Sequence, residues 1–174
     1  LGVTDPDGDA PVYTPASGCG GTDNASFTLV GATVSTAASF NYENGATKTI
    51  CVQADDGQGG VFQQTLTVAV TDVNEPPTDI TLSKHEVAEG APLGTVVGTF
   101  STTGDPEGAT AFTYAPAPGD GSADNAKFII SGNQLKTAAA VDYSVQSVYY
   151  IRVSSTDPGG AAVEKQFVIN VLDH

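Results

Sequence analysis

The chain has 174 residues, which is enough for one large domain or two small ones. It carries 6 Lys and Arg against 20 Asp and Glu, so its formal net charge is −14. This charge repels nucleic acid and anionic lipid and favours cations as partners, although an acidic surface can also serve solubility alone. No apolar run is long enough to cross a membrane, and no signal peptide opens the chain, so we expect any targeting sequence to lie elsewhere.

Residue composition and an internal repeat indicate an all-β chain in two copies. Met and Trp are absent, and no stretch carries helix-forming residues at the helical period. The pattern Asp23-Asn24-Ala25-Ser26-Phe27 returns 101 residues later as Asp124-Asn125-Ala126-Lys127-Phe128. Near the start, Asp5-Pro6-Asp7-Gly8 matches Asp105-Pro106-Glu107-Gly108, with one residue inserted in the second copy. The two halves are therefore predicted to be copies of one unit.

Both cysteines of the chain, Cys19 and Cys51, lie in the first copy. In an oxidising compartment they would pair, closing a loop of about 30 residues and stabilising the fold by about 3 to 4 kcal/mol. In a cytosolic protein they would instead be two buried, inert thiols. We expect the disulfide, and the sequence alone leaves the thiol alternative open.

A short acidic and proline-containing segment joins the two copies. It reads Val70-Thr71-Asp72-Val73-Asn74-Glu75-Pro76-Pro77. The two prolines lack backbone N–H donors and restrict φ, so this segment is predicted to be a stiff linker. The predicted organisation is a first repeat over residues 1–73, a linker over 74–77 and a second repeat over 78–174.

Short apolar runs separated by turn residues predict the strands of the second copy. In chain order these runs are Ile80–Leu82, Val97–Phe100, Phe112–Tyr114, Phe128–Ile130, Tyr149–Val153 and Phe167–Val171. Clusters of Gly, Pro, Asp and Asn separate them at intervals of about ten residues. Seven short antiparallel strands with such turns predict an immunoglobulin-like Greek-key β-sandwich.

The first copy is predicted to lack its N-terminal strands. Leu1 stands where the second copy already has Phe100, so nothing in the first copy corresponds to Ile80–Thr99. A sandwich without these strands would expose an unpaired edge and an open core. We therefore expect two tandem sandwiches, of which the first is a fragment or borrows a strand.

The linker resembles that of the cadherin family, whose repeats end in Asp-x-Asn-Asp before a proline. Asp72-Val73-Asn74-Glu75 precedes Pro76 and is similar to the Asp-x-Asn-Glu form of bacterial cadherin-like repeats. The second copy also resembles the family at Glu89, Asp105-Pro106-Glu107, Asp142-Tyr143-Ser144 and Ser155-Thr156-Asp157. The first copy has Asp5-Pro6-Asp7, Asn41-Tyr42-Glu43 and Ala54-Asp55-Asp56 at the matching positions. The resemblance covers nearly the whole chain.

Because cadherin repeats bind calcium between successive domains, the resemblance implies calcium ligands at three junctions. For the junction between the two copies the implied ligands are Asn41, Glu43, Asp72, Val73, Asn74, Glu75, Asp105, Glu107 and Asp157, with Val73 and Asn74 acting through their carbonyls. For the preceding junction they are Asp5, Asp7 and Asp56, and for the following one Glu89, Asp142 and Asp173. Calcium prefers such all-oxygen ligand sets, which contain no Cys or His. We expect one or two ions at the middle junction.

The acidic motifs also have a simpler interpretation. Asp-Pro-Asp-Gly and Asp-Asp-Gly are ordinary turn sequences, in which the carboxylates would cap their own backbone. The family pattern is moreover incomplete, because Ser144 stands where the family has Glu, Asn41 replaces Asp and Pro76 replaces Asn. The sequence predicts calcium sites and leaves turn capping open as the alternative.

An enzyme is not expected, because acid–base chemistry needs a cleft that raises the pKa of one carboxylate, and the candidate residues occur in duplicate. We expect an extracellular, calcium-stiffened repeat of a surface adhesin or filament, which mediates adhesion or acts as a rigid spacer. Its partners would be neighbouring repeats, and further copies of itself or a surface glycan, with no nucleic acid and no membrane insertion. The alternatives are a carbohydrate- or peptide-binding module and a filament subunit assembled by strand donation.

Overall fold

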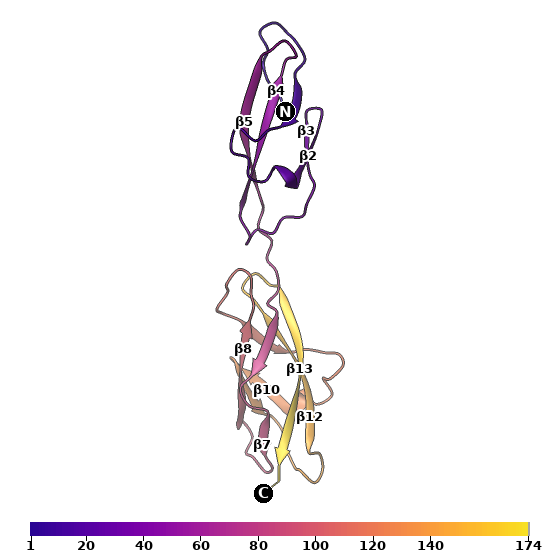
Figure 1. The fold of residues 1–174 in the computed structure, drawn as a ribbon. Coiled ribbons are helices and arrows are strands. Elements are labelled where there is room, and N and C mark those ends of the chain that lie inside the picture. The colour runs from indigo at the N-terminus through magenta and orange to yellow at the C-terminus, as the bar shows by residue number, and fades with distance from the viewer. Residues whose placement is uncertain (174) are drawn as a thin grey trace. The chain divides into compact units, whose positions relative to one another are not determined.

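Antiparallel strands make up nearly all of the regular structure in a computed structural model that describes residues 1–173 (Figure 1). The chain divides into two units, Leu1–Val73 and a second that begins at Asn74, which we call unit 1 and unit 2. In the described residues the helical elements are two short 3-10 turns, η1 (Asn24–Ser26) and η2 (Asn125–Lys127), and no helix has the length to span a membrane. The predicted all-β class is confirmed.

Unit 2 is a sandwich of two four-stranded sheets. Its strands are β6 (Asp79–Leu82), β7 (Glu86–Ala88), β8 (Val96–Thr103), β9 (Thr113–Pro116), β10 (Phe128–Ser131), β11 (Gln134–Thr137), β12 (Val148–Thr156) and β13 (Ala162–Leu172). One sheet has the order β10-β11-β8-β6 and the other β7-β13-β12-β9. The chain leaves the first sheet after β6 and joins the second at β7, which pairs parallel to β13. The strand formed by this switch, β7, lies outside the six apolar runs named above, as does β11.

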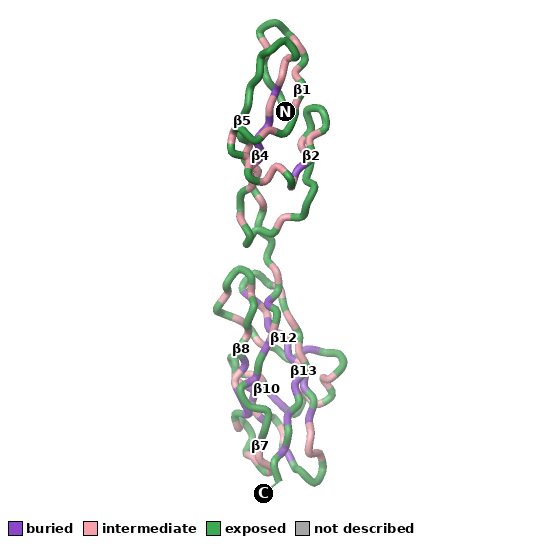
Figure 2. The backbone as a smooth tube through the Cα atoms, in the orientation of Figure 1, coloured by how far each residue is buried: buried purple, intermediate pink, exposed green. Residues whose placement is uncertain are grey.

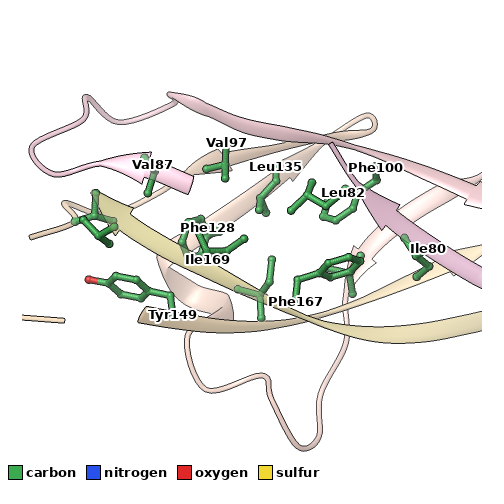
Figure 3. Packing of buried hydrophobic residues seen from close by; sticks show 14 residues of the cluster. Ile80, Leu82, Val87, Val97, Phe100, Phe128, Leu135, Tyr149, Phe167 and Ile169 are labelled. Carbon is green, nitrogen blue, oxygen red and sulfur yellow. The ribbon is translucent and has the colours of Figure 1, made fainter. Parts of the chain in front are cut away.

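Alternation of side chains along each strand builds the core between the two sheets. On β13 the side chains of Phe167, Ile169 and Val171 are buried, and the residues between them are exposed. Figure 3 shows Phe167 and Ile169 on the opposite side of the core from Val97 and Phe100 of β8. The rings of Phe100 and Phe167 lie 5.5 Å apart, centroid to centroid. Each such side chain contributes about 2 to 3 kcal/mol by leaving water, so the core is the main source of stability in unit 2.

The five-residue pattern that marks the repeat fixes a crossing loop to a strand. In unit 2, Asn125 Oδ1 accepts a hydrogen bond of 2.9 Å from the backbone N–H of Arg152 on β12. In unit 1, Asn24 Oδ1 accepts the same bond, at 2.8 Å, from the N–H of Cys51. Each Asn also donates through Nδ2 to a backbone carbonyl eight residues earlier. The repeated Asn is therefore a structural residue, because both ends of its amide are bound to the backbone.

Unit 1 contains the later strands of the same fold. They are β1 (Val12–Pro15), β2 (Phe27–Val30), β3 (Thr33–Thr36), β4 (Thr47–Asp55) and β5 (Val61–Ala69). They form a three-stranded sheet, β1-β4-β5, and the hairpin β2-β3. Across residues 1–73, all of which are described, no strand corresponds to β6, β7 or β8. The prediction that the first copy lacks its N-terminal strands is confirmed.

Residues 1–73 form a smaller core than unit 2. Its buried hydrophobic cluster consists of Phe27, Ile50 and Val52, whereas the corresponding cluster of unit 2 extends over both sheets. Figure 2 shows this difference as short buried stretches in unit 1 against many in unit 2. Hydrophobic burial therefore stabilises unit 1 much less than unit 2.

A disulfide joins a loop of unit 1 to β4. Cys19 and Cys51 are bonded, as expected, and Cys51 lies fully buried on β4. The matching positions of unit 2 are Asp120 and Arg152, and Arg152 Nη1 donates to the carbonyl of Asp120 at 3.3 Å. The same two points of the fold are thus joined covalently in unit 1 and by a hydrogen bond in unit 2.

We predict that replacing both cysteines with alanine lowers the free energy of unfolding of unit 1 by about 3 to 4 kcal/mol, because the unfolded chain regains the entropy of the open loop. Hydrogen exchange of the β4 amides measures this loss, and the β12 amides of unit 2 serve as the internal control. Unchanged protection of β4 would show that the disulfide adds nothing to the stability of unit 1.

Candidate metal centre

Three carboxylates meet at the end of unit 2 where its chain begins. Asp105 and Glu107 lie in the loop after β8, and Asp157 follows β12 of the other sheet. One carboxylate oxygen from each of these residues lies within 4.8 Å of the other two. Asp157 is 6% exposed, and no salt bridge of residues 1–173 includes any of the three. Negative charge is therefore concentrated at a partly buried point without a neutralising cation of the protein.

Backbone amides orient two of these carboxylates in the same way. Asp105 Oδ1 accepts a hydrogen bond of 2.9 Å from the N–H of Ala109, and Asp157 Oδ1 accepts one of 3.0 Å from the N–H of Ala161. Each bond joins a carboxylate to the amide four residues later, so one oxygen is held by its own loop. The second oxygen of Asp105, Oδ2, is buried and has no hydrogen-bond partner among the described residues. Such an atom normally costs free energy, which a bound cation would offset.

The first residues of unit 2 bind directly to this cluster. Asn74 Nδ2 donates to Asp157 Oδ2 at 3.0 Å, and the backbone N–H of Glu75 donates to Glu107 Oε1 at 3.0 Å. Gly159 gives the Asn74 side chain its space, because a Cβ at that position would collide with the Asn74 amide. The start of the unit is thus held by two of the three carboxylates.

The N–H of Glu75 also affects the charge of Glu107. Its hydrogen bond stabilises the ionised form and is the largest influence lowering the pKa of Glu107, while the nearby charge of Asp157 acts in the opposite direction. Glu107 is exposed, so solvent screens much of this effect. The carboxylate nevertheless stays ionised at neutral pH, as a metal ligand must.

The donor set of this cluster fits calcium. Calcium–oxygen bonds are about 2.3 to 2.6 Å long, so two oxygens on one ion lie up to about 5 Å apart, which agrees with the observed grouping. The ligand atoms are all oxygens, a set that suits a hard divalent cation rather than zinc or copper. A positive charge would stabilise both the unpartnered oxygen of Asp105 and the buried carboxylate of Asp157. We therefore call Asp105, Glu107 and Asp157 the carboxylate cluster.

Four of the predicted ligands of the middle junction lie in unit 1. Asn41 Oδ1 accepts a hydrogen bond of 3.0 Å from the N–H of Asn44, so it caps its own turn. Glu43, Asp72 and Val73 are exposed to solvent. Their participation in one site with the carboxylate cluster stays a prediction.

Two of the three residues predicted for the preceding junction, Asp5 and Asp56, cap turns of unit 1. Asp5 Oδ1 accepts from the N–H groups of Asp7 and Gly8 at 2.8 and 3.0 Å. Asp56 Oδ1 accepts from Gln58 and Gly60, and these bonds lower the pKa of Asp56. Within the described part of the chain, Asp5, Asp7 and Asp56 do not gather at ligand distances. Calcium binding by these three residues also stays a prediction.

At the other end of unit 2, two of the predicted residues share one region. Glu89 Oε2 accepts a hydrogen bond of 3.4 Å from the N–H of Tyr143, next to Asp142. Asp142 Oδ1 accepts from the side chain and the N–H of Ser144, which lowers the pKa of Asp142. Asp173 lies exposed just after β13. Among residues 1–173 these three do not form a group at ligand distances.

The side-chain role of Asn74 is not predictable from the sequence, in which its resemblance to the cadherin linker implies a carbonyl ligand only. Its bond to Asp157 depends on the path of the chain entering unit 2 and on the absence of a side chain at Gly159. A glycine two residues after the acidic motif was the available signal.

Known proteins are similar to these repeats in sequence. No family model matches the chain. Protocadherin gamma-A6 of Homo sapiens is 28% identical over 144 residues, which are 80% of this chain and 16% of that protein. Protocadherin gamma-A2 of Homo sapiens is 29% identical over 138 residues, 77% of this chain and 15% of the relative. The chain thus spans about a sixth of the length of these relatives.

Solved structures show the same fold. Domains EC1-2 of human protocadherin-24 match with a TM-score of 0.73 at 20% identity, over 98% of this chain and 85% of that one. Domains 3–6 of protocadherin gamma B2 match with a TM-score of 0.70 at 19% identity, over 100% of this chain and 42% of that one.

The chain resembles cadherin repeats. Its sequence is similar to that of protocadherin repeats, and its fold amounts to about two extracellular cadherin domains. Cadherin repeats are non-enzymatic cell-surface domains, so the expectations of an extracellular location and of no enzymatic activity are confirmed by these relatives. The likeness supports an adhesion-type module of the cadherin class and not specifically its bacterial form.

We predict that, in metal-free buffer, Glu107 titrates below the ordinary glutamate pKa of 4.5, because the Glu75 N–H stabilises its anion. A lowered pKa contributes stability that is present above about pH 4.5 and is lost as the pH falls through the lower, folded-state pKa. The amide chemical shift of Glu75, followed by NMR against pH, reports this midpoint. Glu107→Gln keeps the hydrogen-bond acceptor and should abolish the transition; a midpoint above 4.5 would contradict the assigned hydrogen bond.

Proposed function

We propose that this pair of cadherin repeats binds calcium through the carboxylate cluster and thereby stiffens a cell-surface adhesion protein. The observation that carries the proposal is the grouping of Asp105, Glu107 and buried Asp157 without a protein cation. Removing a carboxylate from water without a counter-charge costs several kcal/mol, and a divalent ion would offset that cost. An acidic surface that served only solubility would have no reason to bury one of its carboxylates.

Each residue would have a distinct part in holding the ion. Asp105 would offer its unpartnered Oδ2, and Asp157 and Glu107 would offer oxygens that Asn74 and Glu75 already orient. The side chain of Glu75 and the carbonyl of Asn74 are further candidate ligands. From unit 1 we propose Asn41, Glu43, Asp72 and the carbonyl of Val73 as the remaining oxygen ligands, which the resemblance to cadherins suggests.

The proposed consequence is mechanical. Without calcium, the carboxylates repel one another and the linker is free to swing; with calcium, they are bridged and the linker is ordered. Extracellular calcium modules bind at about 10⁻⁴ to 10⁻³ M, so occupancy would follow the outside medium. Adhesion proteins need such stiffening because a slack connection transmits little force.

The partners we propose are neighbouring repeats and further copies of the same protein. Protocadherin gamma B7, 21% identical to this chain, has been solved as a cis-dimer of domains EC3-6. Because that likeness establishes the fold alone, self-association of the present chain is an extension of the proposal.

We predict opposite responses to Asp157→Asn in the two metal states. In chelator the variant should be at least as stable as the parent chain, because one charge of a repelling group is removed. With calcium at about a hundredfold excess over the dissociation constant, the parent chain should gain about 2.7 kcal/mol and the variant much less. Thermal unfolding with and without calcium measures both responses.

Asp120→Asn is the matched control, since Asp120 is an exposed aspartate of the same unit outside the cluster. It should leave the calcium response unchanged. If calcium stabilised the Asp157→Asn variant and the parent chain equally, the carboxylate cluster would not be the calcium site.

We further predict that calcium raises the maximum dimension of the chain in solution and narrows its distribution, because an ordered linker samples fewer arrangements. Small-angle X-ray scattering in calcium and in chelator tests this expectation, with magnesium as the control for ionic strength. Identical distance distributions in the two conditions would show that calcium does not stiffen the chain, even if it binds, and would overturn the proposed mechanical role.

A further inference from the structure

Unit 1 contains an acceptor sequence for N-linked glycosylation, Asn24-Ala25-Ser26. Oligosaccharide transfer requires Asn-x-Ser or Asn-x-Thr, and no other such triplet occurs in the 174 residues. The matching triplet of unit 2 is Asn125-Ala126-Lys127, which is not an acceptor. The sequon therefore distinguishes the two copies, although the asparagine itself is common to both.

The folded unit holds the side-chain amide of Asn24 at both ends. Its Nδ2 donates to the carbonyl of Ala16 at 2.6 Å, and its Oδ1 accepts from the N–H of Cys51 on β4 at 2.8 Å. Ala16 and Cys51 are also joined to each other, since the N–H of Ala16 donates to the carbonyl of Cys51 at 2.9 Å. The half-buried amide thus lies between two backbone segments that are themselves hydrogen-bonded.

The space beside the Asn24 oxygen is filled by the backbone. A glycan replaces one hydrogen of Nδ2, and in a trans amide the substituent of the nitrogen lies on the side of the oxygen. Oδ1 is already bonded to the N–H of Cys51, and Gly21 lies so near that a single Cβ there would collide with both atoms. A sugar ring is much larger than a methyl group. The folded loop therefore does not accommodate a glycan at Asn24.

The Cys19–Cys51 disulfide fixes the loop that covers this amide. The loop lies along β4, where the N–H of Asp23 donates to the carbonyl of Thr49 at 2.9 Å. The disulfide joins the start of the same loop to β4, with the two Cα atoms 5.5 Å apart. Such a cross-link limits how far the loop can move from the strand, so Asn24 stays covered once the bond has formed.

We propose that Asn24 is a glycosylation acceptor only while this loop is detached from β4, and that the Cys19–Cys51 disulfide closes the site. In the open chain, Asn24 Nδ2 loses a proton and bonds to the anomeric carbon of a sugar, and the polyprenyl pyrophosphate that carried the sugar leaves. In the competing reaction, the two cysteine thiols form a disulfide, and a disulfide of the surrounding compartment is reduced to thiols. A glycan at Asn24 therefore marks a chain in which the loop has not closed.

The test is production of the chain behind a secretion signal in cultured cells that attach N-glycans, with and without dithiothreitol during synthesis. Made without reductant, the parent chain should carry almost no glycan at Asn24. Reductant, or replacement of both cysteines with alanine, should raise the glycosylated fraction at least about fivefold, because the loop is no longer fixed. Peptide-N-glycosidase and mass spectrometry measure this fraction, since the enzyme converts a glycosylated Asn to Asp.

Lys127→Ser is the matched control. It creates the same sequon at Asn125, whose amide makes the same two kinds of backbone hydrogen bond in unit 2. Unit 2 contains no cysteine, so reductant should leave the glycosylation of Asn125 unchanged. An equal response of Asn24 and Asn125 to reductant would overturn the role of the disulfide.

Hydrogen exchange tests whether the glycan and the folded loop exclude each other. In purified chains that carry the glycan, the β4 amides of residues 50–52 should exchange at least about tenfold faster than in chains without it. A glycan on chains whose β4 amides stay protected would overturn the proposal, and so would equal glycosylation of the parent chain and the cysteine variant. None of these readouts depends on calcium, so the carboxylate cluster is tested separately.

Discussion

Burial of an unneutralised carboxylate, Asp157, is the constraint that organises the end of unit 2. The side chain is 6% exposed and lies close to two further carboxylates, and among the described residues it accepts hydrogen bonds from the amides of Asn74 and Ala161. Amide groups stabilise an anion but do not cancel its charge, so repulsion in the cluster persists in the bare protein. This arrangement costs the bare protein stability, which the cation of our proposal would restore.

The two units reach stability by different routes from the same chain plan. Unit 2 relies on a continuous core between two sheets, with Phe100 and Phe167 near its centre. In residues 1–73 the buried cluster consists of Phe27, Ile50 and Val52, and a covalent link joins Cys51 to a loop at the point where unit 2 uses Arg152. The disulfide acts mainly on the unfolded chain and the core on the folded one, so each can be altered without the other.

The all-β class, the repeat and the strand positions could be predicted because they depend on alternation and on recurrence along the chain. The run from Phe167 to Val171, for example, encodes one face of β13 directly. The change of sheet between β6 and β7 could not be predicted. It depends on which strands β6 and β7 pair with in the folded unit. The orienting role of Asn74 depends likewise on the path of a loop, which residue order does not specify.

Asp56 and Asp157 show why repetition of a motif does not fix its function. They occupy the same position of the two copies, and each accepts a hydrogen bond from the amide four residues later. Asp56 Oδ1 takes a second bond from its own turn, at Gln58, whereas Asp157 binds the side chain of Asn74 through its other oxygen. The carboxylate of Asp56 thus accepts hydrogen bonds from its own turn, as is common in turn sequences. The carboxylate of Asp157 accepts a hydrogen bond from the start of the unit and lies near two more carboxylates. The turn-capping interpretation therefore applies to Asp56, whereas the surroundings of Asp157 support the calcium proposal.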